Sequence, residues 1–545
     1  MSKRDGLARL GKIKTSHGIL DTPTLLPVVN PKILTLSMED LKKCGAQGII
    51  TNSYIIYKNP ELKEIAENKG VHGLLNWSGP IMTDSGTFQS HVYGEIDMQP
   101  EEILNFQKKI GVDIGTVLDV FCEPETRFED AKKELEETQK RIEESDKNKD
   151  SIFLAAPIQG GRHLDLRLKA AQMASKTNAD LFPIGGVVPL MEKNNFKMLA
   201  EVIIASKKGL DTSKPVHLFG CGHPMLFALA TFLGCDLFDS SSYAKFASRD
   251  SLMFTWGTRN LEELEIIPSE FSAAPGINID ELKAMEKKER QKIIAKHNLI
   301  ASFAEIRRVK QAIHDGLLWE LVENRLRTSP ALMKVFEVIK KEIDWIGKFE
   351  PAYRYKTPLK TGEESDFRPV FSNLSNSFKS GEMTHPYFGK VPIHLSETYP
   401  FHPGLLQDDI EGWKMQNWDV ERVKTILDYQ FGKGMGDVLT NGEIELVISR
   451  KTKRLRNLLL NGEHVASLSH RRGLFILQKR GAEIIHENSK STRYRVVVNA
   501  DTAEFNKQGK SVFCKFVDDI DTDLKIMDEC LVVTPKDELI AFGKL

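Results

Sequence analysis

The sequence predicts an α/β protein whose first part is a (β/α)8 barrel. Between residues 36 and about 260, apolar runs of strand length alternate with helical patterns, which is typical of parallel β/α units. Several of these runs end abruptly at a polar residue or a glycine, as buried parallel strands do where they meet a loop. Because such ends gather at one mouth of a barrel, we expect a single site there.

Six runs carry this signal, and helical patterns separate them. The runs lead to Asp84-Ser85, Asp119, Gln159-Gly160, Gly185-Gly186, Gly220 and Asp239-Ser240. The helical patterns cover residues 99–110, 128–146, 164–177, 196–208 and 223–233. The second of these is so highly charged that we expect a solvated outer helix.

The rest of the chain predicts further domains. A strongly helical stretch at 278–324 is expected to cap the barrel, and the composition changes near residue 345. We therefore expect a catalytic barrel at 1–345 and small α+β linker domains at 346–465. Short strands separated by turns, one of them at 511–516, predict a small β-barrel at 466–545.

Composition limits the function classes. A chain of 545 residues holds more than one core, and 75 basic residues balance 76 acidic ones, so net charge does not indicate a partner. Six cysteines without a C-x-x-C pair indicate reduced thiols. We see neither a signal peptide nor a membrane span, and we expect a soluble cytoplasmic protein.

The paired acids Asp84 and Asp239 suggest a division of labour at the mouth. One carboxylate can stay ionised as a nucleophile while the other, with a shifted pKa, moves protons. Each Asp alone is explained equally well as a cap of the following helix or turn. Two of them, with other polar residues at equivalent strand ends, favour function.

Other strand ends suit a planar base. Asp119 can accept the adjacent N–H donors of a guanine-like edge, while Gln159 and the backbone of Gly185-Gly186 can serve a carbonyl oxygen. A salt bridge from Asp119 to Arg127 is the alternative. The small residues that begin with Ser85 let a ligand approach the backbone, and Phe88 would form a wall for it.

Basic residues cluster in the last third of the chain, which suits a phosphate backbone although charge runs are often only solvated surface. They include Arg450, Lys451, Lys453, Arg454, Arg456, Arg471, Arg472 and Arg493. We expect Arg471, Arg472 and Arg493 to contact RNA.

Several motifs together resemble the tRNA-guanine transglycosylases of the archaeal, archaeosine-forming branch. They are Met-Thr-Asp-Ser-Gly-Thr-Phe-Gln at 82–89, Ala-Pro-Ile-Gln-Gly at 156–160, the Gly-Gly block at 182–192, His-Leu-Phe-Gly-Cys-Gly-His-Pro at 217–224 and Asp-Leu-Phe-Asp-Ser-Ser-Ser at 236–242. The segments 493–498 and 529–539 resemble the family's RNA-binding PUA domain.

The resemblance implies base exchange at guanine 15 in the D-arm of tRNA. Asp239 would attack C1′ and expel guanine, and 7-cyano-7-deazaguanine would then enter from a covalent intermediate. Asp84 would move protons, although the two roles are sometimes assigned the other way round. Ser85, Asp119, Gln159 and Gly185-Gly186 would bind the base, and Phe88 would stack on it. A homodimer is common in the family.

One departure concerns a structural zinc that the family holds with three cysteines and a histidine. Ser269, Phe271 and Ala274 occupy the cysteine positions here, while the candidate histidine, His297, remains. We therefore expect no metal and no other cofactor.

Two alternatives stay open. An archaeosine-synthase-like amidotransferase would carry a Lys-Pro-Tyr signature, which this sequence lacks. A non-catalytic tRNA-binding subunit would be compatible with loss of the zinc ligands, but it has no need for Asp84 and Asp239.

Overall fold

The computed structural model describes residues 3–87, 99–268, 273–354, 358, 362–371, 383–385, 389–396, 398–401 and 418–545. The chain divides into two compact units, Met1–Val338 and Ile339–Leu545.

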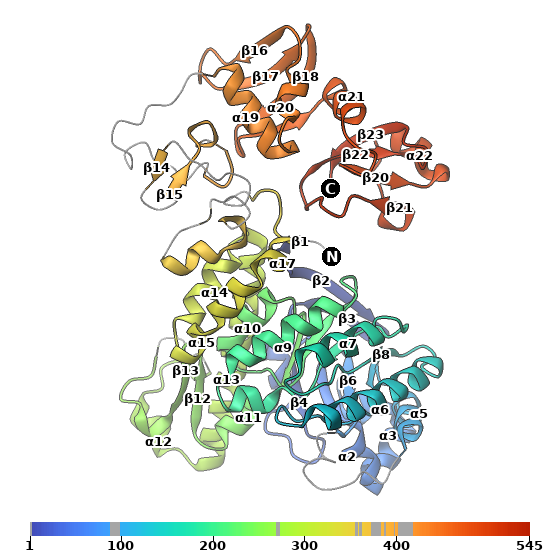
Figure 1. The fold of residues 1–545 in the computed structure, drawn as a ribbon. Coiled ribbons are helices and arrows are strands. Elements are labelled where there is room, and N and C mark those ends of the chain that lie inside the picture. Colours follow the sequence, from blue (N-terminus) through green and yellow to red (C-terminus); the bar gives the residue numbers. More distant parts are fainter. Residues whose placement is uncertain are drawn as a thin grey trace. The chain divides into compact units, whose positions relative to one another are not determined.

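The first unit is built on an eight-stranded parallel barrel (Figure 1). Its strands are β4 (Thr24–Val29), β5 (Ile49–Asn52), β6 (Ile81–Asp84), β7 (Ile114–Thr116), β8 (Phe153–Ala155), β9 (Phe182–Ile184), β10 (Val216–Leu218) and β11 (Leu237–Ser240). They follow chain order around the sheet, and two parallel bridges, Ala155 to Leu181 and Ile158 to Ile184, join β8 to the β9 side. The predicted barrel is confirmed.

Helices surround the strands (Figure 1). They are α1 (Met38–Cys44), α2 (Ser53–Lys58), α3 (Pro60–Leu75), α5 (Pro100–Lys109), α6 (Phe128–Lys147), α7 (Leu164–Ala174), α8 (Val188–Glu192), α9 (Phe196–Gly209), α10 (Pro224–Phe232) and α11 (Ser242–Ala247). The charged helix α6 buries a narrow face that includes Ala131, Leu135 and Ile142, spaced four and seven residues apart, and exposes most of its charges. It is the solvated outer helix that its sequence predicts.

A hairpin and a helical cap complete the first unit. The hairpin β12 (Ser251–Phe254) and β13 (Gly257–Asn260) precedes the 3-10 turn η1 (Leu261–Glu263). The cap contains α12 (Ile279–Ala284), α13 (Lys287–Asp315), α14 (Leu318–Leu326) and α15 (Pro330–Met333), and α16 (Val335–Lys341) follows. This agrees with the helical stretch expected at 278–324.

The β/α alternation begins before residue 36, where the sequence pattern placed its start. An antiparallel sheet of β1 (Lys3–Asp5), β2 (Ala8–Thr15) and β3 (Gly18–Thr22) precedes β4, the first barrel strand. Strand β4 is preceded by Pro23 and contains Pro27, residues that weaken a strand signal. Leu20 of β3 is fully buried and joins the barrel core, which includes Leu26, Ile50, Met82, Ile114, Ala155, Leu181 and Leu237.

The second unit holds two four-stranded sheets. One contains β16 (Ile444–Ile448), β17 (Leu455–Leu460), β18 (Glu463–Ser469) and β19 (Leu474–Leu477), and the other contains β20 (Arg495–Val498), β21 (Val517–Ile520), β22 (Glu529–Val533) and β23 (Leu539–Lys544). Helices α19 (Val420–Phe431), α20 (Met435–Leu439), α21 (Lys479–Asn488) and α22 (Ala500–Lys507) accompany them. The expected boundary at 465/466 falls inside β18, and the domain limits stay predictions.

Shorter elements fill the rest of this unit. They are α17 (Ile343–Gly347), η2 (Glu363–Phe367), the hairpin β14 (Met383–His385) and β15 (Gly389–Val391), η3 (Ile393–Leu395) and η5 (Cys514–Phe516). The strand predicted at 511–516 is wrong, because η5 occupies its end and pairing with β20 starts only at Val517.

A buried carboxylate anchors the N-terminal hairpin at the amino-terminal end of the barrel strands. Asp113 Oδ1 lies 3.0 Å from His17 Nδ1, and its Oδ2 lies 3.3 Å from His72 Nε2. Ile81 N–H donates to the same carboxylate at 2.9 Å. The two imidazole rings stack with centroids 3.6 Å apart, which favours a hydrogen-bonded anchor over metal coordination, because ligating nitrogens must aim their in-plane lone pairs at one ion.

We predict that Asp113→Asn lowers the free energy of unfolding by about 1–3 kcal/mol near neutral pH. Burial alone would raise the pKa of Asp113, but hydrogen bonds from His72, Ile81 N–H and His17 hold it well below its usual range. The contribution to stability is therefore present above the unfolded-state pKa and is lost as pH falls. Denaturant titrations of both proteins at several acidic pH values measure this, and an equal acid dependence would contradict it.

Candidate active site

The predicted site residues gather at the carboxyl ends of the barrel strands. Asp84 is the last residue of β6, and Asp239 lies near the end of β11. Asp119, Gln159 and Gly185 lie in the segments that follow β7, β8 and β9. One barrel mouth therefore receives all five residues, as the strand-end pattern predicts.

Asp84 sits among polar groups that are neutral rather than cationic. Asn52 Nδ2 donates to its Oδ2 at 3.2 Å, and Gly86 N–H approaches its Oδ1 at 3.4 Å. Burial raises the pKa of Asp84 to about 7, and the charges of Asp119 and Asp239 act in the same direction. These effects require the three carboxylates to lie near one another, and they leave Asp84 able to carry or release a proton near neutral pH.

Asp239 is held by the neighbouring strand. Gly220 N–H donates to its Oδ1 at 2.8 Å, and His217 Nε2 lies 2.9 Å from the same oxygen. His217 is fully buried and pairs in register with Leu237, so it lies on the inner face of the barrel with that core residue. The capping alternative does not hold for Asp239, because Ser240 Oγ accepts from Ser242 N–H at 2.8 Å.

Asp119 and Gln159 form a buried pair. Gln159 Nε2 donates to Asp119 Oδ2 at 2.5 Å, and burial raises the pKa of Asp119. Gln159 Oε1 is buried and has no hydrogen-bond partner among the described residues. Within those residues no ion pair joins Asp119 to Arg127, so the salt-bridge alternative is not supported. The two side chains thus offer carboxylate oxygens and a free amide oxygen to a ligand.

Gly185 and Gly186 are required by close packing at this point. A Cβ on Gly185 would lie 2.5 Å from Gln159 Nε2, and one on Gly186 would lie 2.5 Å from the carbonyl oxygen of Cys122. Gly186 also has a φ of +68°. Gly185 N–H donates to Ile158 O at 3.1 Å, whereas Gly186 N–H has no acceptor among the described residues. Of the two amides, only that of Gly186 is available to a ligand.

Three residues of this region were not identified from the sequence. Asn52 ends β5 as the predicted site residues end their strands, so the same pattern could have found it. A histidine inside the apolar run 216–219 was the available signal for His217. Arg167 lies on α7 and is recognisable only from its contacts in three dimensions.

Two further residues, Ser85 and Phe88, were predicted from the sequence to contact the base. Phe88 lies outside the described residues. Ser85 is buried, and its Oγ lies 3.2 Å from Thr87 Oγ1, while Thr87 Oγ1 donates to the backbone oxygen of Asp119 at 3.2 Å. Ser85 therefore belongs to a hydrogen-bonded turn that links the segment after β6 to the segment after β7.

The residues at the family's zinc positions do not fit that ion. Ser269 and Phe271 lie outside the described residues, and Ala274 has no donor atom in its side chain. His297 is fully buried, its Nε2 lies 3.1 Å from Met253 O, and burial lowers its pKa to about 4. A single histidine engaged with a backbone carbonyl does not provide a zinc donor set.

The predicted RNA-binding arginines differ in how they are engaged. Arg471 is exposed in the turn between β18 and β19. The guanidinium of Arg472 lies over the ring of Tyr353, 3.9 Å from its centroid. Arg493 pairs with Asp523 at 2.7 Å. All three stay predictions, and Arg471 has the most accessible side chain.

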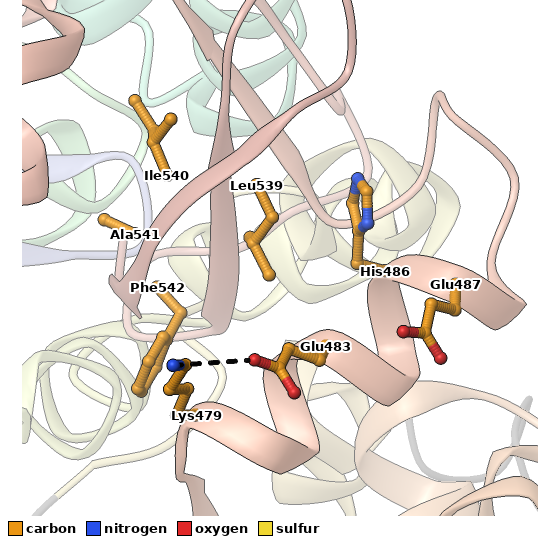
Figure 2. Close-up of a pocket in the computed structure, with 8 residues that line it drawn as sticks. All are labelled: Lys479, Glu483, His486, Glu487, Leu539, Ile540, Ala541 and Phe542. Atoms are coloured by element: carbon orange, nitrogen blue, oxygen red, sulfur yellow. Dashed lines mark ion pairs between the residues drawn. The ribbon is translucent and has the colours of Figure 1, made fainter.

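A cavity of about 410 Å³ lies between α21 and β23 in the second unit (Figure 2). Glu483 and Glu487 of α21 line one side, and Leu539 to Phe542 of β23 line the other. Lys479 Nζ reaches Glu483 at 4.0 Å, and Arg480 Nη1 lies 3.2 Å from Glu483 and 3.9 Å from Glu487. Both cations are thus engaged by carboxylates, so the cavity shows no free positive charge among its described residues that would favour a phosphate backbone.

Comparison with known proteins agrees with this architecture. Residues 4–331 match the family described as "Queuine tRNA-ribosyltransferase", residues 421–491 match "Patch-forming domain C2 of tRNA-guanine transglycosylase" and residues 494–545 match the PUA domain. A tRNA-guanine(15) transglycosylase of Methanocaldococcus jannaschii is 39% identical, over 99% of this chain and 95% of its own. One from Thermococcus onnurineus is 41% identical, over 99% and 94%.

A parallel barrel with acids at its mouth, joined to a PUA domain, defines a class of enzymes that modify RNA bases. The chain belongs to the tRNA-guanine transglycosylase family, whose members are pentosyltransferases. Among the described helices, none has the length and apolarity needed to cross a membrane.

We predict that Asp84→Asn leaves the melting temperature unchanged or raises it at about pH 8. Because burial first, and then Asp119 and Asp239, raise the pKa of Asp84 to about 7, the folded protein binds more protons than the unfolded chain between the unfolded-state pKa and that value. Stability should therefore fall across this window as pH rises, and the Asn variant should lack this loss. Melting curves from about pH 5 to pH 8 test it, with Asp113→Asn as a control of opposite sign. A variant less stable than wild type at every pH would contradict it.

Proposed function

We propose that this protein exchanges guanine at position 15 of tRNA for 7-cyano-7-deazaguanine, a step of archaeosine biosynthesis. The names of its full-length relatives support the target position. The observation that carries the proposal is the convergence of Asp84, Asp119 and Asp239 at one barrel mouth.

The chemistry assigned to the acids follows from their surroundings. A carboxylate oxygen of Asp239 attacks C1′ of the ribose, and the electron pair of the C1′–N9 bond leaves with guanine. Asp84, whose raised pKa lets it carry a proton near neutral pH, protonates the departing base. The incoming base then loses its N9 proton to Asp84 and attacks C1′, which releases Asp239.

Base recognition is assigned to the Asp119 carboxylate and to two groups that have no partner among the described residues, Gly186 N–H and Gln159 Oε1. The Asp119 carboxylate accepts the adjacent N–H groups of a guanine-like edge, and Gly186 N–H donates to the carbonyl oxygen of the base. Gln159 fixes Asp119 through its amide nitrogen and presents its free oxygen at the same place. Ser85 and Phe88 stay predicted contacts, and 7-cyano-7-deazaguanine shares the guanine edge that these groups would bind.

We predict that Asp239→Asn abolishes incorporation of radiolabelled guanine into unmodified tRNA and prevents a covalent enzyme–RNA adduct. Asp84→Asn should reduce exchange by about 10²–10⁴-fold, because it removes only the proton carrier. Adducts are measured by denaturing electrophoresis and exchange by filter counting. Binding of tRNA by the wild-type protein without exchange would favour the non-catalytic subunit. Amidation of tRNA that already carries the nitrile would favour the amidotransferase.

We also propose that no zinc binds at the family's cysteine positions. The donor set supports this, since Ser269, Phe271 and Ala274 replace the thiolates. We predict less than about 0.1 zinc per chain by elemental analysis after dialysis, and unchanged exchange in the presence of a chelator. A stoichiometric ion that is lost in His297→Ala would contradict the proposal.

The tRNA surface that we propose lies at one end of the first sheet of the second unit. Strands β16 to β19 are consecutive and antiparallel, so the β16–β17 and β18–β19 turns lie at the same end. These turns carry exposed cations without ion pairs among the described residues, namely Arg450, Lys451, Lys453, Arg454 and Arg471. We call these residues the basic turn cluster. A homodimer, as in related enzymes, stays a prediction.

We predict that replacing Arg450, Lys451 and Arg471 together with Ala weakens tRNA binding and reduces the slope of log affinity against log salt by about one for each phosphate that is no longer neutralised. The maximal rate at saturating tRNA should not change, because the cluster touches no reacting atom. Lys140→Ala, an exposed cation on α6, is the control. An unchanged salt slope would place the tRNA surface elsewhere.

A further inference from the structure

The guanidinium of Arg167 is a buried charge in the first unit. The side chain is fully buried, and among the described residues it forms no ion pair with a carboxylate. Burial lowers its pKa to about 10, which still leaves it charged at neutral pH. A buried charge without a counter-ion is costly, so its polar contacts must offset that cost.

Among the described residues, every acceptor of this guanidinium is a backbone carbonyl in the two loops that carry the base-recognition groups, and Nη2 has no acceptor. Nε donates to Gly161 O at 2.8 Å, and Nη1 donates to Ile158 O at 2.7 Å and to Gly185 O at 2.9 Å. Ile158 and Gly161 enclose Gln159 in sequence, and Gly185 O belongs to the Gly185–Gly186 peptide. One planar group therefore fixes both loops at once.

The peptide geometry places the Gly186 N–H on the side opposite to this contact. The Gly185–Gly186 bond is trans, so its N–H points opposite to the carbonyl that Arg167 holds. Gly186 N–H is thereby directed away from the guanidinium, and it has no acceptor among the described residues. A positive charge on the carbonyl side polarises the peptide and makes this N–H a stronger donor.

From this geometry we infer that Arg167 is a positioning residue that acts through the Gly185–Gly186 peptide on the carbonyl oxygen of the purine. The inference rests on the proposed function. When the C1′–N9 bond breaks, its electron pair goes to the purine, and part of that negative charge resides on the carbonyl oxygen. The polarised Gly186 N–H stabilises this oxygen as the donors of an oxyanion hole do.

The experiment compares Arg167→Lys and Arg167→Gln with wild type. Lysine keeps the charge but cannot span three carbonyls, whereas glutamine keeps a planar donor without the charge. Arg325→Lys is the control, because Arg325 is a buried arginine that pairs with Glu305 at 2.8 Å away from the barrel mouth. Folding is followed by thermal melting, and assays run below the lowest melting temperature, so that either folded variant decides the question.

The informative readout is inhibition of exchange by two free bases, guanine and 2-aminopurine, which lacks the carbonyl oxygen. Wild type should prefer guanine, and each Arg167 variant should lose about tenfold or more of this preference, with a lower kcat and unchanged tRNA affinity. Arg325→Lys should lower stability but keep the preference. If both inhibition constants rise by the same factor, Arg167 has only a structural role and the inference is overturned. Absence of exchange in wild type would instead contradict the proposed function.

Discussion

The site depends on the fact that three carboxylates in one barrel mouth, two of them buried and Asp84 partly buried, cannot all be ionised without a large electrostatic cost. Asp84 is the acid most affected, because burial and the charges of Asp119 and Asp239 raise its pKa to about 7. Asp239 receives Gly220 N–H and lies against His217, and Asp119 receives the amide of Gln159. Asp84 is thus disposed to hold a proton, whereas Asp239 accepts a backbone hydrogen bond that stabilises its negative charge. Burial also raises the pKa of Asp119, although the hydrogen bond from Gln159 opposes that shift. The difference between Asp84 and Asp239 is the separation of roles that the proposed base exchange requires.

Much of this site is predictable because it follows from the period and ends of parallel strands. Asp84, Asp119, Gln159, Gly185 and Asp239 all stand where an apolar run stops, and a parallel barrel brings such ends together whatever their separation in sequence. The strand-end pattern predicts the positions of these residues but does not fix their chemical roles. The sequence left a salt bridge from Asp119 to Arg127 open as the alternative, and only the structure shows its carboxylate engaged by Gln159.

The site residues that the sequence did not reveal either form two hydrogen bonds with different parts of the chain or contact residues that are distant in sequence. Asn52 caps α2 through Oδ1, which accepts from Ile55 N–H at 2.8 Å, and its Nδ2 reaches Asp84. In the sequence the strand-end position and the capping role of Asn52 are visible, but its contact with Asp84 is not. His217 and Arg167 acquire meaning from neighbours on other elements, which no local period encodes. Strand β4 was missed because Pro27 interrupts a run that would otherwise indicate a strand.

The distribution of cations distinguishes the three acids of the barrel mouth from other carboxylates of the first unit. Asp236 pairs with Arg9, Asp250 with Arg290 and Glu305 with Arg325, all at 2.8–2.9 Å. Among the described residues, no lysine or arginine pairs directly with the three acids of the mouth. A direct arginine partner would lower the pKa of Asp84 and remove its capacity to carry a proton near neutral pH. Arg167 instead contacts the mouth through backbone carbonyls, so its charge can strengthen an N–H donor toward the base without holding an acid in its ionised form.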